Sequence, residues 1–154
     1  LDYGTNLLLK TTMESLEGKV LDLGCGYGPV GVLVYLHRKI ICDMVDVNER
    51  ALDLARKNLI RNHAKGNVFT SDGFSKIHED YDAILLNPPI RRGKEVIYKL
   101  FEDAKEHLTP GGKLLIVIQK KQGMKSAKEK LESIYDEVNT LDKKGGYYIL
   151  EAKN

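Results

Sequence analysis

The sequence predicts an α/β protein, a three-layer sandwich of helices around a mostly parallel seven-stranded sheet that ends in an antiparallel hairpin. Short apolar runs bounded by glycine, typical of buried parallel strands, recur along the 154 residues. Segments with apolar residues at helical spacing separate most of these runs. The last two runs have no helix between them and flank Gly145-Gly146, which is typical of a hairpin turn.

The first half of the chain predicts three helices and three strands. A helix at 5–16 ends at Gly18, and the apolar run at 19–23 predicts the first strand. The segment 30–38 is rich in β-branched residues, but we predict a helix there. Pro29 suits a first helical turn, and a parallel sheet needs a crossover before its next strand. Then follow a strand at 40–47, a helix capped by Asn48 and a strand at 67–70.

The second half predicts the rest of the sheet. A buried strand at 81–86 precedes an amphipathic helix at 94–108, which we expect Pro110-Gly111-Gly112 to break. The remaining predicted elements are a strand at 113–118, a helix at 124–134 and hairpin strands at 138–142 and 147–152. No change of composition marks a second domain, so residues 1–154 are expected to form one domain. Because the chain begins at Leu1 rather than Met, we expect further residues to precede it in the full product.

Composition and charge exclude several classes of protein. The net charge is +2, from 24 basic and 22 acidic side chains, so any nucleic-acid contact must come from a local basic patch. Two cysteines cannot form the disulfide framework of a secreted domain, and no Cys or His pair has zinc-ligand spacing. No apolar run approaches the roughly 18–20 residues of a membrane span. We expect a reduced, cytoplasmic protein, monomeric, without metal and without membrane association.

A glycine-rich segment lies between the first predicted strand and the helix that follows. Residues 22–28 are Asp-Leu-Gly-Cys-Gly-Tyr-Gly. Glycines at such a junction allow a tight turn and let a ligand approach backbone N–H groups. Asp46 ends the next predicted strand, about 20 residues further on, where an acid accepts hydrogen bonds from ribose hydroxyls in nucleotide folds. The sequence therefore predicts a nucleotide-type cofactor site at this edge of the sheet.

The glycine loop alone leaves the cofactor open. Gly26, Gly28 and Gly31 match the dinucleotide fingerprint, but that interpretation gives Asp22 and Gly24 no role. The form with a leading aspartate resembles the first motif of the class I methyltransferases, which use S-adenosylmethionine.

This resemblance implies roles for individual residues. Asp22 would lie near the methionine end of the cofactor, and Asp46 would bind its ribose. The segment 71–74 resembles the adenine-binding turn of the class, in which Asp72 would accept from the adenine amino group and Phe74 would pack on the ring. The implied cofactor-binding residues are Asp22, Gly24, Cys25, Gly26, Gly28, Asp46, Val47, Asn48, Asp72, Gly73, Phe74 and Asn87.

Asn87-Pro88-Pro89-Ile90 directly follows the fourth predicted strand, and we predict that it is the catalytic element. Proline ends a central strand and holds the residue before it extended. The side-chain oxygen of Asn87 and the carbonyl of Pro88 are then two fixed acceptors, without a competing N–H from either proline. Two acceptors can draw an exocyclic amino nitrogen toward tetrahedral geometry and aim its lone pair at the sulfonium methyl. Catalysis would then be mostly positioning.

Through these motifs, the whole chain resembles the methyltransferase domain of the ribosomal small-subunit RNA guanine-N2 methyltransferases, the C-type family. Residues 1–5, like the family's opening segment near the cofactor, and residues 119–123 carry the resemblance further. It implies methyl transfer to guanine N2 in 16S ribosomal RNA, with ribosomal RNA or the small subunit as partner. Ile90 stands where many amino-group methyltransferases have Tyr or Phe to stack on a flipped base, so the stacking partner is unidentified.

Basic residues follow the fourth and fifth predicted strands, where a rim could hold RNA phosphates. A solvated charged face explains the lysine-rich helix at 124–134 equally well. The candidate substrate-binding residues are Arg91, Arg92, Lys94 and Lys121.

Three other functions remain open from the sequence. Protein glutamine-N5 methyltransferases also use Asn-Pro-Pro, usually followed by Tyr, so Ile90 and the basic residues after it count against that substrate. A nicotinamide-dependent oxidoreductase leaves the segment 87–89 without a role. A non-catalytic RNA-binding module has no need of Asn87.

Overall fold

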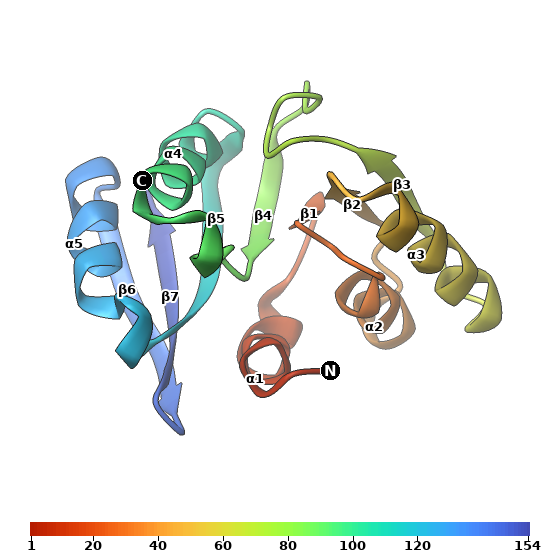
Figure 1. The fold of residues 1–154 in the computed structure, drawn as a ribbon, viewed down its shortest axis with the longest axis horizontal. Helices are drawn as coiled ribbons and strands as arrows, with labels where there is room; N and C mark the ends of the chain where they lie inside the picture. The colour runs from red at the N-terminus through yellow and green to blue at the C-terminus, as the bar shows by residue number, and fades with distance from the viewer.

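The computed structural model describes all 154 residues and confirms the α/β sandwich (Figure 1). Seven strands form one sheet in the order β3-β2-β1-β4-β5-β7-β6. Strands β1 to β5 run parallel, whereas β7 pairs antiparallel with both β5 and β6. The strands are β1 (Val20–Leu23), β2 (Cys42–Asp46), β3 (Gly66–Thr70), β4 (Tyr81–Leu86), β5 (Leu108–Gln119), β6 (Glu137–Lys144) and β7 (Tyr147–Lys153).

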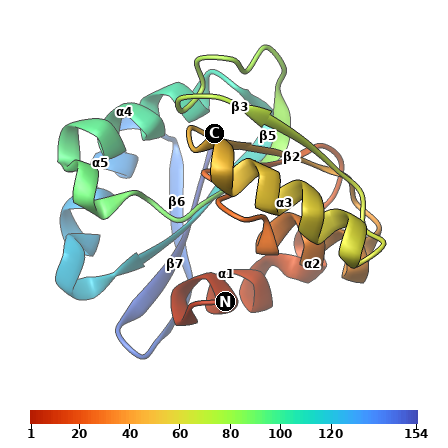
Figure 2. The ribbon, with the colours of Figure 1, turned by 45° about the vertical axis from the view of Figure 1, so that its right-hand side comes forward.

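Helices cover both faces of the sheet (Figure 1, Figure 2). One buried apolar cluster joins the sheet to α1, α2 and α3, and a second joins its other face to α4 and α5. No helix is both long enough and apolar enough to cross a membrane. The helices are α1 (Tyr3–Thr12), α2 (Pro29–Arg38), α3 (Glu49–Arg61), α4 (Lys94–Lys105) and α5 (Met124–Ile134), with 3-10 turns η1 (Met13–Ser15), η2 (Ile90–Arg92) and η3 (Lys120–Gln122).

Local sequence signals explain where the helices begin. The side chain of Asp2 caps α1 by accepting from the N–H of Thr5, and Asn48 caps α3. Pro29 occupies the first turn of α2, so the β-branched segment that follows forms the predicted helix and buries its valines against the sheet.

One predicted boundary is wrong. The segment Pro110-Gly111-Gly112 does not separate a helix from a strand but lies inside β5. Leu108 already pairs with Tyr81, and the ladder resumes only after a register shift. Gly111 adopts a left-handed conformation, with φ of 80°, so these residues form a bulge that a strand can tolerate. The other element boundaries agree with the predicted ones to within a few residues.

The parallel strands bring the predicted motifs together. β1, β2 and β4 are neighbours in the sheet and run in the same direction, so their carboxyl ends meet at one edge. In Figure 1 the arrow of β4 points toward the lower side of the molecule, where α1 and the N-terminus lie. The loop after β1 carries the glycines, Asp46 is the last residue of β2, and Asn87 is the first residue after β4.

Candidate functional site

The three glycines of the loop after β1 serve two different purposes. Gly24, Gly26 and Gly28 all have left-handed backbone conformations, with φ of 74°, 55° and 90°. A Cβ added at Gly24 or Gly26 would meet nothing within 4 Å, so the loop leaves open space above its backbone. A Cβ added at Gly28 would come within 2.9 Å of Ala55 and Met44, so this glycine is needed for packing of α2 on α3 and β2.

Asp46 ties the glycine loop to the end of β2. Its Oδ2 accepts a hydrogen bond from the N–H of Gly26 at 2.8 Å, and its Oδ1 accepts from the N–H of Asn48 at 3.0 Å. Each carboxylate oxygen retains a second lone pair. The carboxylate therefore orders the loop and can still accept from a ligand.

Asp22, at the end of β1, is a buried carboxyl group with an unused oxygen. Its side chain is 4% exposed, and Oδ2 has no hydrogen-bond partner. Burial raises the pKa of Asp22 to about 7; the nearby charge of Asp46 adds to this, and the N–H of Gly31 opposes it. An unpaired buried acceptor that lines a cavity is suited to a donor or cation from a ligand.

Two adjoining cavities lie over these residues. The larger cavity, about 340 Å³, extends from the start of α1 across the glycine loop, and the smaller cavity, about 210 Å³, extends toward Asp46. Asn87 and Gly24 line both cavities. The predicted cofactor residues that line one or both are Asp22, Gly24, Cys25, Gly26, Asp46, Val47, Gly73 and Asn87.

The other predicted cofactor residues lie outside these two cavities. Gly28 packs in the core, and the side chain of Asn48 caps α3 by accepting from two backbone N–H groups. Asp72 and Phe74 line a third cavity, of about 530 Å³. The Phe74 ring stacks on His107, with centroids 5.1 Å apart, so that face is already covered. Cofactor contacts by these residues stay predictions.

The side-chain amide of Asn87 is held from the opposite end of the chain. Its Nδ2 donates to the hydroxyl of Thr5 at 3.0 Å. That hydroxyl donates to Asp2 Oδ2 at 3.1 Å, and the Thr5 N–H donates to Asp2 Oδ1 at 2.9 Å. Because Nδ2 is engaged with Thr5, Oδ1 of Asn87 is left as the free acceptor. These roles of Asp2 and Thr5 were not predicted from the sequence, although an aspartate directly before a helix is a capping signal.

The turn after Asn87 differs in two respects from the sequence interpretation. The carbonyl of Pro88 accepts from the N–H of Ile90 at 2.9 Å, so a backbone N–H does compete, and one lone pair of this oxygen remains. Ile90 is half-buried and packs against the apolar cluster beneath α4 and α5. It therefore anchors the turn on the core. Pro89 lines the smaller cavity and precedes η2.

The predicted substrate-binding residues are exposed but lie in three different segments. Arg91 and Arg92 form part of η2, Lys94 begins α4 and Lys121 lies in η3. Arg92 pairs with Asp72 at 3.6 Å, which links the turn after β4 to the loop after β3. No group of His, Cys, Asp and Glu side chains could hold a metal ion, and both cysteines are free.

The raised pKa of Asp22 makes stability depend on pH. Between about pH 4 and pH 7 the folded protein keeps a proton on Asp22 that the unfolded chain has lost. The free energy of unfolding therefore falls as the pH rises through this window. The variant Asp22→Asn lacks this titration. We expect its stability relative to the wild type to increase by up to about 4 kcal/mol from pH 4 to pH 7.5. Urea denaturation of both proteins at several pH values measures the difference, and a difference independent of pH would contradict the assignment.

A sheet of this strand order, with a glycine loop after β1 and Asn-Pro-Pro after β4, defines a Rossmann-like methyltransferase domain. Comparison with known proteins leads to the same class and to a narrower group within it. The chain belongs to the methyltransferase small-domain family, whose model matches residues 1–151. The prediction of a methyltransferase is thereby confirmed.

Three known proteins illustrate the similarity. YbxB of Bacillus subtilis, described as uncharacterised, is 46% identical over 99% of the chain and 78% of its own length. Ribosomal RNA small subunit methyltransferase C of Haemophilus influenzae is 36% identical over 100% of the chain and 47% of its own length. The 16S rRNA N2 G1207 methyltransferase of T. thermophilus, RsmC, solved in complex with AdoMet and guanosine, superposes with a TM-score of 0.87 at 26% identity. The chain covers 43% of that structure, so it spans less than half of these two longer proteins.

Proposed function

We propose that the chain transfers a methyl group from S-adenosylmethionine to the N2 amino group of a guanine in 16S ribosomal RNA. The observation that carries the proposal is the amide of Asn87, which Thr5 holds through Nδ2 and which belongs to a residue lining both cavities beside the glycine loop. Similarity to proteins named as 16S rRNA guanine-N2 and small-subunit methyltransferases supports the substrate. A ribosomal substrate implies a cytoplasmic enzyme.

The residues present fit S-adenosylmethionine. The open space above Gly24 and Gly26 admits a ligand against the backbone, and the unpartnered oxygen of Asp22 would receive the α-ammonium group. Asp46 would accept from the ribose hydroxyls through its remaining lone pairs. The smaller cavity, lined by Val47 and by the residues after β3, would take the adenine. When bound, this cofactor supplies an electrophilic methyl group on a cationic sulfur.

The chain's contribution to the reaction is to hold the amino group. Oδ1 of Asn87 accepts one N–H of the guanine amino group, and the remaining lone pair of the Pro88 carbonyl accepts the other. These contacts turn the nitrogen lone pair toward the methyl group in line with the departing sulfur. Once the nitrogen is cationic its proton is acidic and can pass to water, so no side chain is required as a base. Thr5 is a positioning residue, since it acts only through the Asn87 amide.

Calorimetric titration with S-adenosylhomocysteine, with NAD titrated in parallel, tests the cofactor. We expect binding of the first compound only. Incubation of 16S ribosomal RNA and of small subunits with tritiated-methyl cofactor, followed by digestion to nucleosides, tests the substrate. Label in N2-methylguanosine is expected. Label in a glutamine of a ribosomal protein would mean that the substrate is protein and not RNA. Binding of NAD alone would overturn the proposal.

A further inference from the structure

A surface beside the proposed active site combines lysines from two segments that are distant in the sequence. The backbone N–H of Lys120 donates to the carbonyl of Gly146 at 2.8 Å, which fixes η3 against the turn of the β6–β7 hairpin. Gln119 and Lys144 pair with Tyr147 from its two sides, so Lys120 and Lys121 of η3 lie across β7 from Lys143 and Lys144 at the end of β6.

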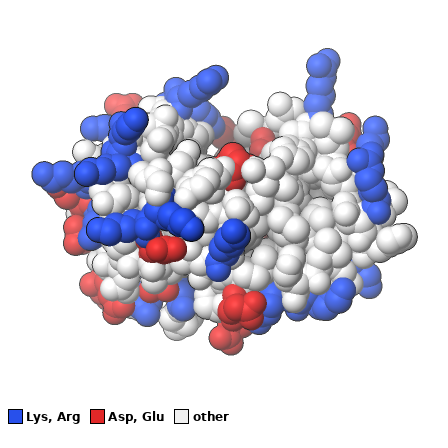
Figure 3. All heavy atoms as spheres, turned by 90° about the horizontal axis from the view of Figure 1, so that it is seen from below, with Lys and Arg blue, Asp and Glu red and all other residues white.

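These four lysines are free to meet an anion. All four are exposed, and none forms an ion pair, whereas Lys19, Lys99, Lys113, Lys130 and Lys153 pair with carboxylates. Asp142, the neighbouring acid, accepts a hydrogen bond from the backbone N–H of Lys143 at 2.8 Å. Figure 3 views the molecule from below, and many basic side chains lie on its left half, the side of α5, β6 and β7 in Figure 1.

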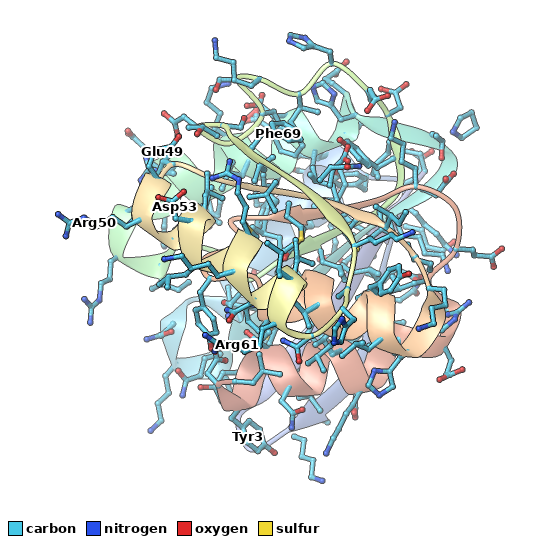
Figure 4. All side chains as sticks on the ribbon, turned by 90° about the vertical axis from the view of Figure 1, so that its right-hand side faces the viewer. Tyr3, Glu49, Arg50, Asp53, Arg61 and Phe69 are labelled. Atoms are coloured by element: carbon cyan, nitrogen blue, oxygen red, sulfur yellow. The ribbon has the colours of Figure 1, made fainter.

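Two tyrosines adjoin the lysines. The rings of Tyr3 and Tyr147 have centroids 5.4 Å apart, and the Tyr3 ring lies over the hairpin turn, since a Cβ at Gly145 would come within 3.0 Å of its hydroxyl. Tyr3 is 48% exposed, and Figure 4 shows it on the outside of the molecule, on α1. An exposed ring among lysines can stack on an unpaired base whose phosphates the lysines hold.

The position of Tyr3 connects this surface to the reaction. Tyr3 lies in the first turn of α1, the same turn in which Thr5 holds Asn87. A strand whose target base reaches Asn87 would pass over α1 and meet the tyrosines and the hairpin next.

We propose that Tyr3, Tyr147, Lys120, Lys121, Lys143 and Lys144, here called the lysine–tyrosine surface, bind the single-stranded RNA that flanks the target nucleotide. The inference rests on the proposed function and extends it, because it assigns the flanking strand a path and a conformation. Single-stranded rather than duplex RNA fits, since only unstacked bases can reach an aromatic ring.

The experiment compares two double variants that remove the same charge. Lys143→Ala/Lys144→Ala alters the surface, and Lys57→Ala/Lys65→Ala removes two exposed, unpaired lysines from α3 and the loop before β3. The probe is a fluorescent 20-nucleotide single-stranded RNA of mixed sequence, titrated at several salt concentrations. We expect the hairpin variant to raise Kd about tenfold and to lower the slope of log Kd against log salt by about 1.4, for two phosphate contacts of about 0.7 each. The control variant should bind as the wild type does.

A third variant separates stacking from charge. Tyr3→Leu keeps an apolar side chain on Tyr147, so we expect weaker RNA binding, by about fivefold to tenfold, with an unchanged salt slope. Titration with S-adenosylhomocysteine should give the wild-type Kd for every variant, which shows that the fold and the cofactor pocket persist. If the hairpin variant binds RNA like the control while the wild type methylates ribosomal RNA, the surface is excluded and the proposed function stands. If the wild type neither binds nor methylates RNA, both fail.

Discussion

Replacement of Asn87 by alanine is expected to abolish methyl transfer while cofactor affinity stays within a few-fold of the wild type. The amide oxygen is one of two acceptors assigned to the amino group, and loss of correct positioning removes most of the catalytic effect. We expect a drop in the single-turnover rate of at least about 10³-fold, the scale of losing a preorganised polar contact to the reacting group. Single-turnover transfer of labelled methyl to ribosomal RNA measures it. Wild-type turnover in this variant would exclude the mechanism.

Thr5→Val is the matched variant for this test, because it retains Asn87 and removes the hydroxyl that holds its amide. The bond from that hydroxyl to Asp2 Oδ2 is lost as well, whereas the helix cap from Asp2 to the Thr5 N–H is kept. Without that partner the amide can rotate and present Nδ2 instead of Oδ1. We expect kcat of Thr5→Val to fall about tenfold to 100-fold with little change in KM for RNA. Thr5→Ser keeps a hydroxyl and is expected to retain most of the wild-type kcat. Equal loss of activity in Thr5→Ser and Thr5→Val would mean that packing of α1, not amide orientation, is what Thr5 provides.

Replacement of Asp46 by alanine is expected to weaken cofactor binding by about 1.5–3 kcal/mol, the scale of charge-assisted hydrogen bonds. This corresponds to roughly a tenfold to 150-fold rise in Kd for S-adenosylhomocysteine. Part of the loss is indirect, because Asp46 also holds the N–H of Gly26 and so orders the glycine loop. Calorimetry measures Kd, and thermal unfolding of the ligand-free protein measures the contribution to the loop.

Asp46→Asn separates the two roles of this residue. Asparagine keeps one acceptor oxygen, which can serve the Gly26 N–H, but it lacks the charge that strengthens a bond to ribose hydroxyls. The side-chain NH2 group cannot accept from the Asn48 N–H, so we expect ligand-free stability between those of the wild type and the alanine variant, together with an intermediate Kd. An unchanged Kd in the alanine variant would move the ribose contact to another residue.

The sequence predicted those features that depend on neighbouring residues or on strand order. The strand ends that carry Gly24, Asp46 and Asn87 meet in the structure, as parallel pairing requires. The contact between Thr5 and Asn87 could not be predicted, because it joins residues 82 positions apart through the docking of α1. Nor could the sequence distinguish Gly28, which is needed for packing, from the glycines that border open space.

Two further differences have a similar origin. Proline and glycine at 110–112 were interpreted as a break, whereas the partner strand stabilises them as a bulge within β5. Ile90 stands where many amino-group methyltransferases have a stacking ring, and the sequence could not show that its side chain packs against the nearby apolar cluster. The conformational preferences of a short segment do not show where a partner strand or the apolar core will lie.

The hydrogen bonds of Asp2 couple the opening of the first turn of α1 to the orientation of Thr5. One oxygen of this carboxylate caps the helix and the other holds the Thr5 hydroxyl, so a single fraying event releases both. Helix termini open and close with free energies far below that of global unfolding. If Asn87 acts as proposed, the fraction of molecules with a closed first turn scales the observed rate, because only those molecules hold its amide through Thr5. Warming that melts this turn would lower turnover well before the sheet unfolds.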